Sequence, residues 1–166
     1  MPPELVIRRA DLASDADAAV VVALLDAYAR DPMGDGEPLA ADVRERLVPA
    51  LREHPTTLIW LAWLDEKPVG IVTAFVGFST FRARPLINLH DVAVLPDARG
   101  QGVGRALLAA VEEHAMAIGC CRLTLEVLEA NHRAKGLYES VGFSQATYLE
   151  DAGAALFFVK SLAADE

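Results

Sequence analysis

A glycine-rich segment lies directly ahead of an apolar helical pattern and has the residue types of an anion site. Its residues are Arg99-Gly100-Gln101-Gly102-Val103-Gly104-Arg105. The first amides of a helix have no partner inside the helix, and the helix dipole is positive at that end, so this segment can bind a diphosphate. Glycines also let a ligand approach the backbone closely. The alternative is a tight structural turn without a ligand.

Two familiar phosphate sites do not fit this segment. The phosphate loop of NTPases needs Gly-Lys-Ser/Thr, which does not follow here. The dinucleotide fingerprint needs its three glycines in a fixed pattern after a first strand. The segment therefore fits neither site, and we expect a diphosphate cradle of another kind.

The elements that would position this cradle are predicted from periodicity and turn residues. We expect helices over residues 14–30, 39–53, 102–118 and 131–141. We expect strands over residues 5–9, 56–64, 69–77, 86–95, 121–128, 143–149 and 155–160. Consecutive strands in the first half favour antiparallel pairing, and helices after single strands in the second half favour a parallel crossover, so the sheet should be mixed.

Composition excludes several classes of function. The net charge of -9 argues against nucleic acid, although it is compatible with a cationic substrate or with a merely solubilising surface. No apolar run is long enough for a membrane span, and residues 1–4 do not resemble a leader, so we expect a cytoplasmic protein without membrane contact. Cys120 and Cys121 are adjacent, which favours free thiols. We expect no metal.

The chain resembles the Gcn5-related N-acetyltransferases, the GNAT family. The family's diphosphate signature is Arg or Gln, two residues, Gly, one residue, then Gly or Ala, and Arg99, Gly102 and Gly104 fill it. The downstream block looks like the second signature, and it reads Asn131-His132-Arg133-Ala134-Lys135-Gly136-Leu137-Tyr138-Glu139-Ser140-Val141-Gly142-Phe143. The resemblance covers nearly the whole element order, with its motifs between residues 86 and 143.

The resemblance implies one α/β (α+β) domain over residues 1–166 that binds acetyl-CoA. Its central sheet would have about seven strands, be mixed and splayed, and carry helices on both faces. The pantetheine arm would enter the splay and pair with the backbone of Val92 to Val94. The diphosphate would meet the amides of residues 100–105. The implied donor contacts are Val92, Ala93, Val94, Arg99, Gly100, Gln101, Gly102, Val103, Gly104, Arg105, Asn131, Ala134, Leu137 and Tyr138.

Acyl transfer to an amine needs a base, and His90 and Glu126 are the candidates, with Asp91 as a weaker one. A histidine has a pKa of about 6.5, which suits removal of an ammonium proton. Strict alternation would give His90 the face of Val92 and give Asp91 the opposite face. His90 also matches a histidine of arylalkylamine N-acetyltransferases, whose companion histidine is Asn88 here. The alternative for His90 is a histidine that only hydrogen-bonds in the core or lines the pocket. The alternative for Glu126 is an exposed strand glutamate without a catalytic role.

Tyr138 is the predicted general acid. A phenol of pKa about 10 is well matched to a thiolate leaving group, and the family commonly places a tyrosine here. The alternative is ordinary packing. The oxyanion is expected to accept a hydrogen bond from the N–H of Val92 or of a neighbouring residue.

The acceptor is predicted to be a primary amine of a small molecule. In the family the first two helices and their loop set acceptor specificity, so we name Tyr28, Asp31 and Asp35 as substrate-binding. Asn88 and Asp91, on the predicted strand over residues 86–95, are named with them. Two alternatives remain open: acetylation of a lysine or N-terminus of a protein, and a non-catalytic module that senses acyl-CoA.

The two last predicted strands also suggest a homodimer. They carry Leu156, Phe157 and Phe158, and edge strands often pair between subunits. The alternative is ordinary packing in a monomer.

Overall fold

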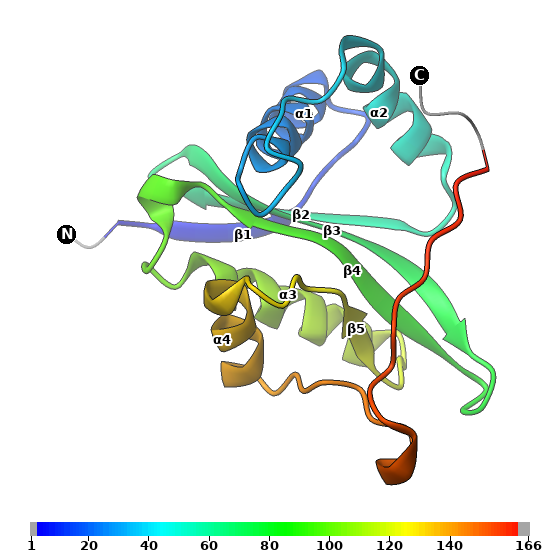
Figure 1. The fold of residues 1–166 in the computed structure, drawn as a ribbon. Helices are drawn as coiled ribbons and strands as arrows, with labels where there is room; N and C mark the ends of the chain where they lie inside the picture. The colour runs from blue at the N-terminus through cyan, green and yellow to red at the C-terminus, as the bar shows by residue number, and fades with distance from the viewer. Residues whose placement is uncertain (1–2, 163–166) are drawn as a thin grey trace.

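The computed structural model describes residues 3–162, so the ends of the predicted domain, residues 1, 2 and 163–166, lie outside it (Figure 1). The strands are β1 Leu5–Arg9, β2 Thr57–Leu64, β3 Lys67–Ser79, β4 Arg84–Val94 and β5 Leu123–Leu125. The helices are α1 Asp15–Ala29, α2 Ala41–Glu53, α3 Val103–Ala117 and α4 His132–Ser140, with short 3₁₀ turns at Pro96–Ala98 and Glu150–Ala152.

The strands form one mixed sheet, as predicted. They lie in the order β1-β2-β3-β4-β5. The pairs from β1 to β4 are antiparallel, whereas β5 runs parallel to β4. The chain reaches β5 through α3, which is the crossover that a parallel pair requires.

Helices cover both faces of the sheet (Figure 1). Alternate residues of β2 face opposite sides, so Ile59 and Leu61 pack with α1 and α2, while Trp60 and Ala62 pack with α3. Both sets are buried, which gives one apolar core above the sheet and another below it. No helix within residues 3–162 is long and apolar enough to cross a bilayer.

Helix α3 owes its position to one apolar stripe. Val103, Leu107, Val111 and Ala115 recur every four residues and are all buried. Gly119, with φ of 76°, ends the helix in the left-handed region. The same stripe therefore fixes the N-terminal end of α3, where the glycine-rich segment lies.

The two cysteines after α3 are free thiols, as their adjacency predicts. Burial raises the pKa of the Cys120 thiol. The thiol therefore stays protonated at neutral pH.

The last part of the chain differs from the prediction. The described sheet has five strands rather than about seven, because residues 143–149 and 155–160 form no strand. Apart from Phe143, which packs against the core, their large apolar side chains are exposed, as at Phe158 and Val159. High β-propensity makes a backbone extended, but a strand also needs a neighbour that supplies the ladder hydrogen bonds. The predicted pairing of these segments between subunits stays a prediction.

A charged pair joins the first strand to the first helix. Two Arg8 nitrogens donate to the Asp17 carboxylate at 2.7 Å each, and the Asp11 N–H donates at 2.8 Å. We expect Asp17→Asn to lower the free energy of unfolding by about 2 kcal/mol, since charge-assisted bonds contribute about 1.5–3 kcal/mol and the half-exposed Arg8 is partly screened. Urea unfolding at pH 7 measures this loss.

The same pair makes stability depend on acid. The hydrogen bonds from Arg8, with the Asp11 amide, hold the pKa of Asp17 below its usual range. Its contribution is thus present above pH 4 and lost as the pH falls through the lowered pKa. The difference in unfolding free energy between the parent chain and Asp17→Asn should therefore become smaller below pH 4. Asp15→Asn is the control, because Asp15 lies in the same first turn and is exposed. The difference in unfolding free energy between the parent chain and Asp15→Asn should not change below pH 4.

Candidate active site

The sheet opens between β4 and β5. The two strands pair only from Ile87 to Leu89 and from Leu123 to Leu125, while β4 continues to Val94. The chain after Leu125 diverges, and a cleft of about 1840 Å³ lies in the gap. Its walls come from the end of β4, the start of α3, residues 122–129, helix α4, the C-terminal end of α1 and part of residues 143–157.

The free edge of β4 presents backbone groups to this cleft. Leu95 donates its N–H to the carbonyl of Val69 at 2.8 Å, so by alternation Val92 and Val94 turn their backbone groups away from β3. Val92, Ala93 and Val94, which the family resemblance implies as donor contacts, line the cleft. An extended ligand could therefore pair with this edge.

The glycine-rich segment forms one end of the cleft. Gly100 and Gly102 have φ of 74° and 83°, a region that other residues rarely adopt, and Gly102 is the N-cap of α3. A Cβ at either position would meet no protein atom within 4 Å, so the space in front of the backbone is open. A Cβ at Gly104 would lie 2.8 Å from Leu137 Cδ2, which shows how closely α3 approaches α4.

The donor set of this loop fits a diphosphate. The amides of Val103 and Gly104 lie in the first helical turn and have no partner inside α3. Arg105 also lines the cleft, although its Nη2 donates to Ser140 Oγ at 2.9 Å. Gln101 lies outside the lining, where its side chain donates to the Asp97 carbonyl at 2.9 Å.

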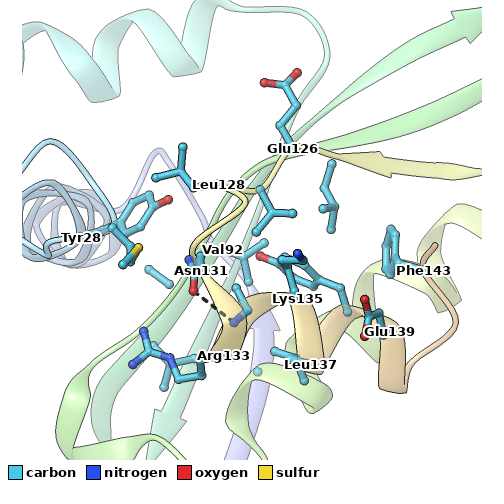
Figure 2. A pocket seen from close by; sticks show the side chains of 18 of the residues that line it. Tyr28, Val92, Glu126, Leu128, Asn131, Arg133, Lys135, Leu137, Glu139 and Phe143 are labelled. Atoms are coloured by element: carbon cyan, nitrogen blue, oxygen red, sulfur yellow. Dashed lines mark hydrogen bonds between the residues drawn. The ribbon is translucent and has the colours of Figure 1, made fainter. Parts of the chain in front are cut away.

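Helix α4 forms the opposite wall, with Ala134 and Leu137 in its lining. Asn131 caps the helix, because its Oδ1 accepts the Ala134 N–H at 3.2 Å (Figure 2). The Nδ2 end of Asn131 is then the part of the side chain suited to donate to a ligand. Arg133 and Lys135 also line the cleft. They carry no predicted role, although cations two and four residues after a helix N-cap are a signal that the sequence offers.

Two phenols line the cleft. Tyr138 on α4 is only 8% exposed and lies against Phe143, with ring centroids 5.9 Å apart. Burial, and secondly the charge of Tyr28, raise the pKa of Tyr138 to about 12. Burial also raises the pKa of Tyr28, on α1, with smaller effects from Asp91 and neighbouring acids. Both phenols are therefore protonated at neutral pH, and Tyr138 keeps a proton to donate, as a weaker acid than a free phenol.

The predicted acceptor-side acids occupy different surroundings. Asp31 lines the cleft but is bound to Arg99, whose Nη2 donates to Asp31 Oδ2 at 2.7 Å. This bond, with the Met33 amide, lowers the pKa of Asp31. Asp35 is exposed and lies outside the lining. Asp91 accepts a hydrogen bond from the buried Thr73 hydroxyl and also lies outside the lining.

Asn88 serves the sheet rather than the cleft. Its Nδ2 donates to Thr124 Oγ1 at 3.0 Å, across the short pairing of β4 with β5. It does not belong to the cleft lining. This hydrogen bond joins β4 to β5 next to the point where the two strands separate.

A β-bulge changes the face of His90. Thr73 pairs with Asp91 but Ala74 pairs with Leu89, so His90 is an extra residue on β4. Its ring lies edge-on to Phe75, on the face of α1 and α2, whereas Val92 packs into the core on the α3 side. The predicted shared face of His90 and Val92 is therefore wrong, because strict alternation does not survive a bulge.

The second base candidate lies in the cleft wall. Glu126 follows β5 at the point of divergence and is exposed. Figure 2 shows its carboxylate directed away from α4. His90, in contrast, is exposed outside the lining. The structure thus brings Glu126, Tyr28 and Tyr138 to one cleft and leaves His90 beside it.

Comparisons with known proteins agree with this geometry. The family model described as "Acetyltransferase (GNAT) family" matches residues 21–143, which include the glycine-rich segment and the α4 block. The chain is similar to thialysine N-epsilon-acetyltransferase of Bos taurus, with 39% identity over 82 residues, 49% of this chain and 48% of that protein. The match thus spans about half the length of that relative.

Two further likenesses extend over most of the chain. The uncharacterized N-acetyltransferase YhfO of Bacillus subtilis (strain 168) is 29% identical over 135 residues, 81% of this chain and 89% of that one. Among solved structures, aminoglycoside N-acetyltransferase AAC(6')-Iy in complex with CoA has a TM-score of 0.74, 16% identity and 98% coverage of both chains. This last likeness supports the fold alone. With its splayed sheet, its glycine-rich loop and a family match over residues 21–143, the chain belongs to the GNAT acetyltransferase family.

Proposed function

We propose that this chain transfers an acetyl group from acetyl-CoA to the primary amine of a small molecule, by direct attack within a ternary complex. The observation that carries the proposal is the cleft where β4 and β5 separate. It has a glycine-rich helix N-terminus at one end and the buried phenol of Tyr138 in its wall.

The donor would lie along the free edge of β4. The backbone of Val92 would pair with the pantetheine arm, and the amides of residues 100–105 would receive the diphosphate. Asn131 would donate through Nδ2 from the start of α4. This arrangement would hold the thioester between the two walls and restrict its orientation, which lowers the entropic part of the barrier.

The transfer forms one bond and breaks another. The neutral amine nitrogen attacks the thioester carbonyl carbon, a C–N bond forms, and the C–S bond breaks. The N–H of Val92 would stabilise the developing oxyanion. Tyr138 would give its phenolic proton to the departing thiolate and regain one from solvent, while a base takes the proton that the amine loses. The products are the N-acetylated amine and the CoA thiol.

The base remains a choice between two residues. Glu126 lies in the cleft wall and can act directly or through water. His90 lies on the α1 and α2 face and would need at least one bridging water, because it is outside the lining. We therefore favour Glu126 as the proton acceptor and keep His90 as the second candidate.

The acceptor class is inferred from charge and from the name of a similar protein. The chain carries 24 acidic against 15 basic residues, which favours approach of a cation. Thialysine, in the name of the similar Bos taurus protein, is a small amine. Tyr28 lines the side of the cleft that is formed by α1, where the amine would enter.

The deciding experiment follows thiol release from acetyl-CoA with polyamines, arylalkylamines, amino sugars, amino acids and lysine peptides. Release that requires a small amine supports the proposal, and release only with peptides replaces it by protein acetylation. Binding of acetyl-CoA without turnover on any acceptor would favour the acyl-CoA sensor. If the chain did not bind acetyl-CoA at all, the interpretation of the cleft as the acetyl-CoA site would be overturned.

A further inference from the structure

One ion pair joins the glycine-rich loop to the turn between α1 and α2. Arg99 Nη2 lies 2.7 Å from Asp31 Oδ2, although the two residues are 68 positions apart in the sequence. Both residues line the cleft, Arg99 at the loop assigned to the donor and Asp31 at the wall assigned to the acceptor. The pair is thus a direct physical link between the two halves of the proposed site.

Arg99 is braced at two points. Its Nε donates to the carbonyl of Val94 at 3.0 Å, on the free edge of β4. Its side chain is 27% exposed and that of Asp31 is 14% exposed, so solvent screens this pair much less than a surface ion pair. A shift of the glycine-rich loop would therefore change the position of Asp31.

The turn that carries Asp31 is tightly closed. The Met33 N–H donates to Asp31 Oδ1 at 2.9 Å, and the Gly34 N–H donates to the Asp31 carbonyl at 2.8 Å. The Gly36 N–H reaches the Ala29 carbonyl at 2.9 Å, which ties the turn to the end of α1. A Cβ at Gly34 would collide with the Tyr28 carbonyl, so the turn lies directly against the residue that enters the cleft.

We propose that the Arg99–Asp31 ion pair is a positioning device that transmits donor binding to the acceptor wall. A donor held by the loop would displace water from around Arg99, which strengthens the ion pair and fixes the turn with Met33 and Tyr28. The amine would then meet an ordered wall only after acetyl-CoA has bound. Asp31 acts through Arg99 and touches no reacting atom. This inference rests on the proposed function.

Amide hydrogen exchange of the turn tests the link without any amine. Coenzyme A is the probe, and the exchange rates of residues 31–36 are measured with and without it. In the parent chain we expect saturating coenzyme A to slow exchange of the Gly34 and Gly36 amides about tenfold. In Asp31→Asn, which keeps an oxygen for the Met33 amide but loses the charge, the slowing should disappear although coenzyme A still raises the melting temperature.

Two further variants make the test specific. Arg99→Gln removes the same ion pair from the other side, and the double variant Asp31→Asn/Arg99→Gln should show no additional loss, since the two residues act as one unit. Asp42→Asn is the matched control, because Asp42 forms an ion pair with Arg46 at 2.8 Å on α2, with both side chains largely exposed. Asp42→Asn should leave the tenfold slowing of amide exchange by coenzyme A unchanged.

The outcomes separate the two proposals. Equal slowing in the parent chain and in Asp31→Asn, or no slowing in a parent chain that binds coenzyme A, would overturn the positioning role alone. A parent chain that does not bind coenzyme A would overturn the proposed function, and this inference with it.

Discussion

Tyr138→Phe is expected to lower kcat by about 10²- to 10³-fold while leaving the Kd of acetyl-CoA within about twofold. The substitution removes one oxygen from a side chain that is 8% exposed and keeps the ring that packs on Phe143. The fold and the donor cleft should therefore persist. Steady-state kinetics and calorimetry with acetyl-CoA measure the two quantities.

The second phenol of the cleft offers a comparison. Tyr28→Phe removes the same atom from the wall on α1, where we place the amine. We expect it to raise the KM for the amine by about three- to tenfold with a much smaller effect on kcat, as for loss of a binding hydrogen bond. A larger kcat loss in Tyr28→Phe than in Tyr138→Phe would assign the proton donor to Tyr28 instead.

The raised pKa of Tyr138 gives the kinetics and the stability a defined pH dependence. With a pKa of about 12, this phenol remains the protonated, donating form through pH 10, so its ionisation should cause no alkaline decline of kcat below that pH. Its pKa in the unfolded chain is about 10. The buried neutral phenol therefore contributes stability that is present below pH 10 and lost as the pH rises towards 12. The stability of Tyr138→Phe should fall less steeply over that range.

Gly102→Ala is expected to weaken acetyl-CoA binding by at least about tenfold. At φ of 83° an alanine costs about 1–2 kcal/mol, and its methyl group would project into the open space before the first turn of α3. A diphosphate could then no longer approach the loop amides closely. Calorimetric titration with acetyl-CoA measures the change.

Gly119→Ala is the matched control for the loop. Gly119 has φ of 76° at the other end of α3, and a Cβ there would also meet no protein atom within 4 Å. Both variants should lose a similar amount of unfolding free energy, because the backbone strain is alike. Only Gly102→Ala should lose affinity, and an equal loss of affinity in Gly119→Ala would mean that the effect comes from general destabilisation of α3.

The sequence determined the elements whose causes are local. The four-residue spacing of Leu107, Val111 and Ala115 predicted α3 within a residue or two, and the turn residues at Asp65 and Glu66 predicted the hairpin of β2 and β3. These patterns depend on neighbours a few positions away, so they can be read without tertiary contacts. The positions of Tyr138 and the glycine-rich loop in one cleft followed from the family resemblance and are seen in the structure.

Only the tertiary structure decided the features that join distant segments. The bulge at His90 depends on the register of β3 against β4, and strand periodicity cannot show where an extra residue will be inserted. The partner of Asp31 is Arg99, 68 positions away, and nothing near either residue specifies that pair. The two last segments have the composition of strands but form none, because strand formation also requires a neighbouring edge, which composition alone does not supply.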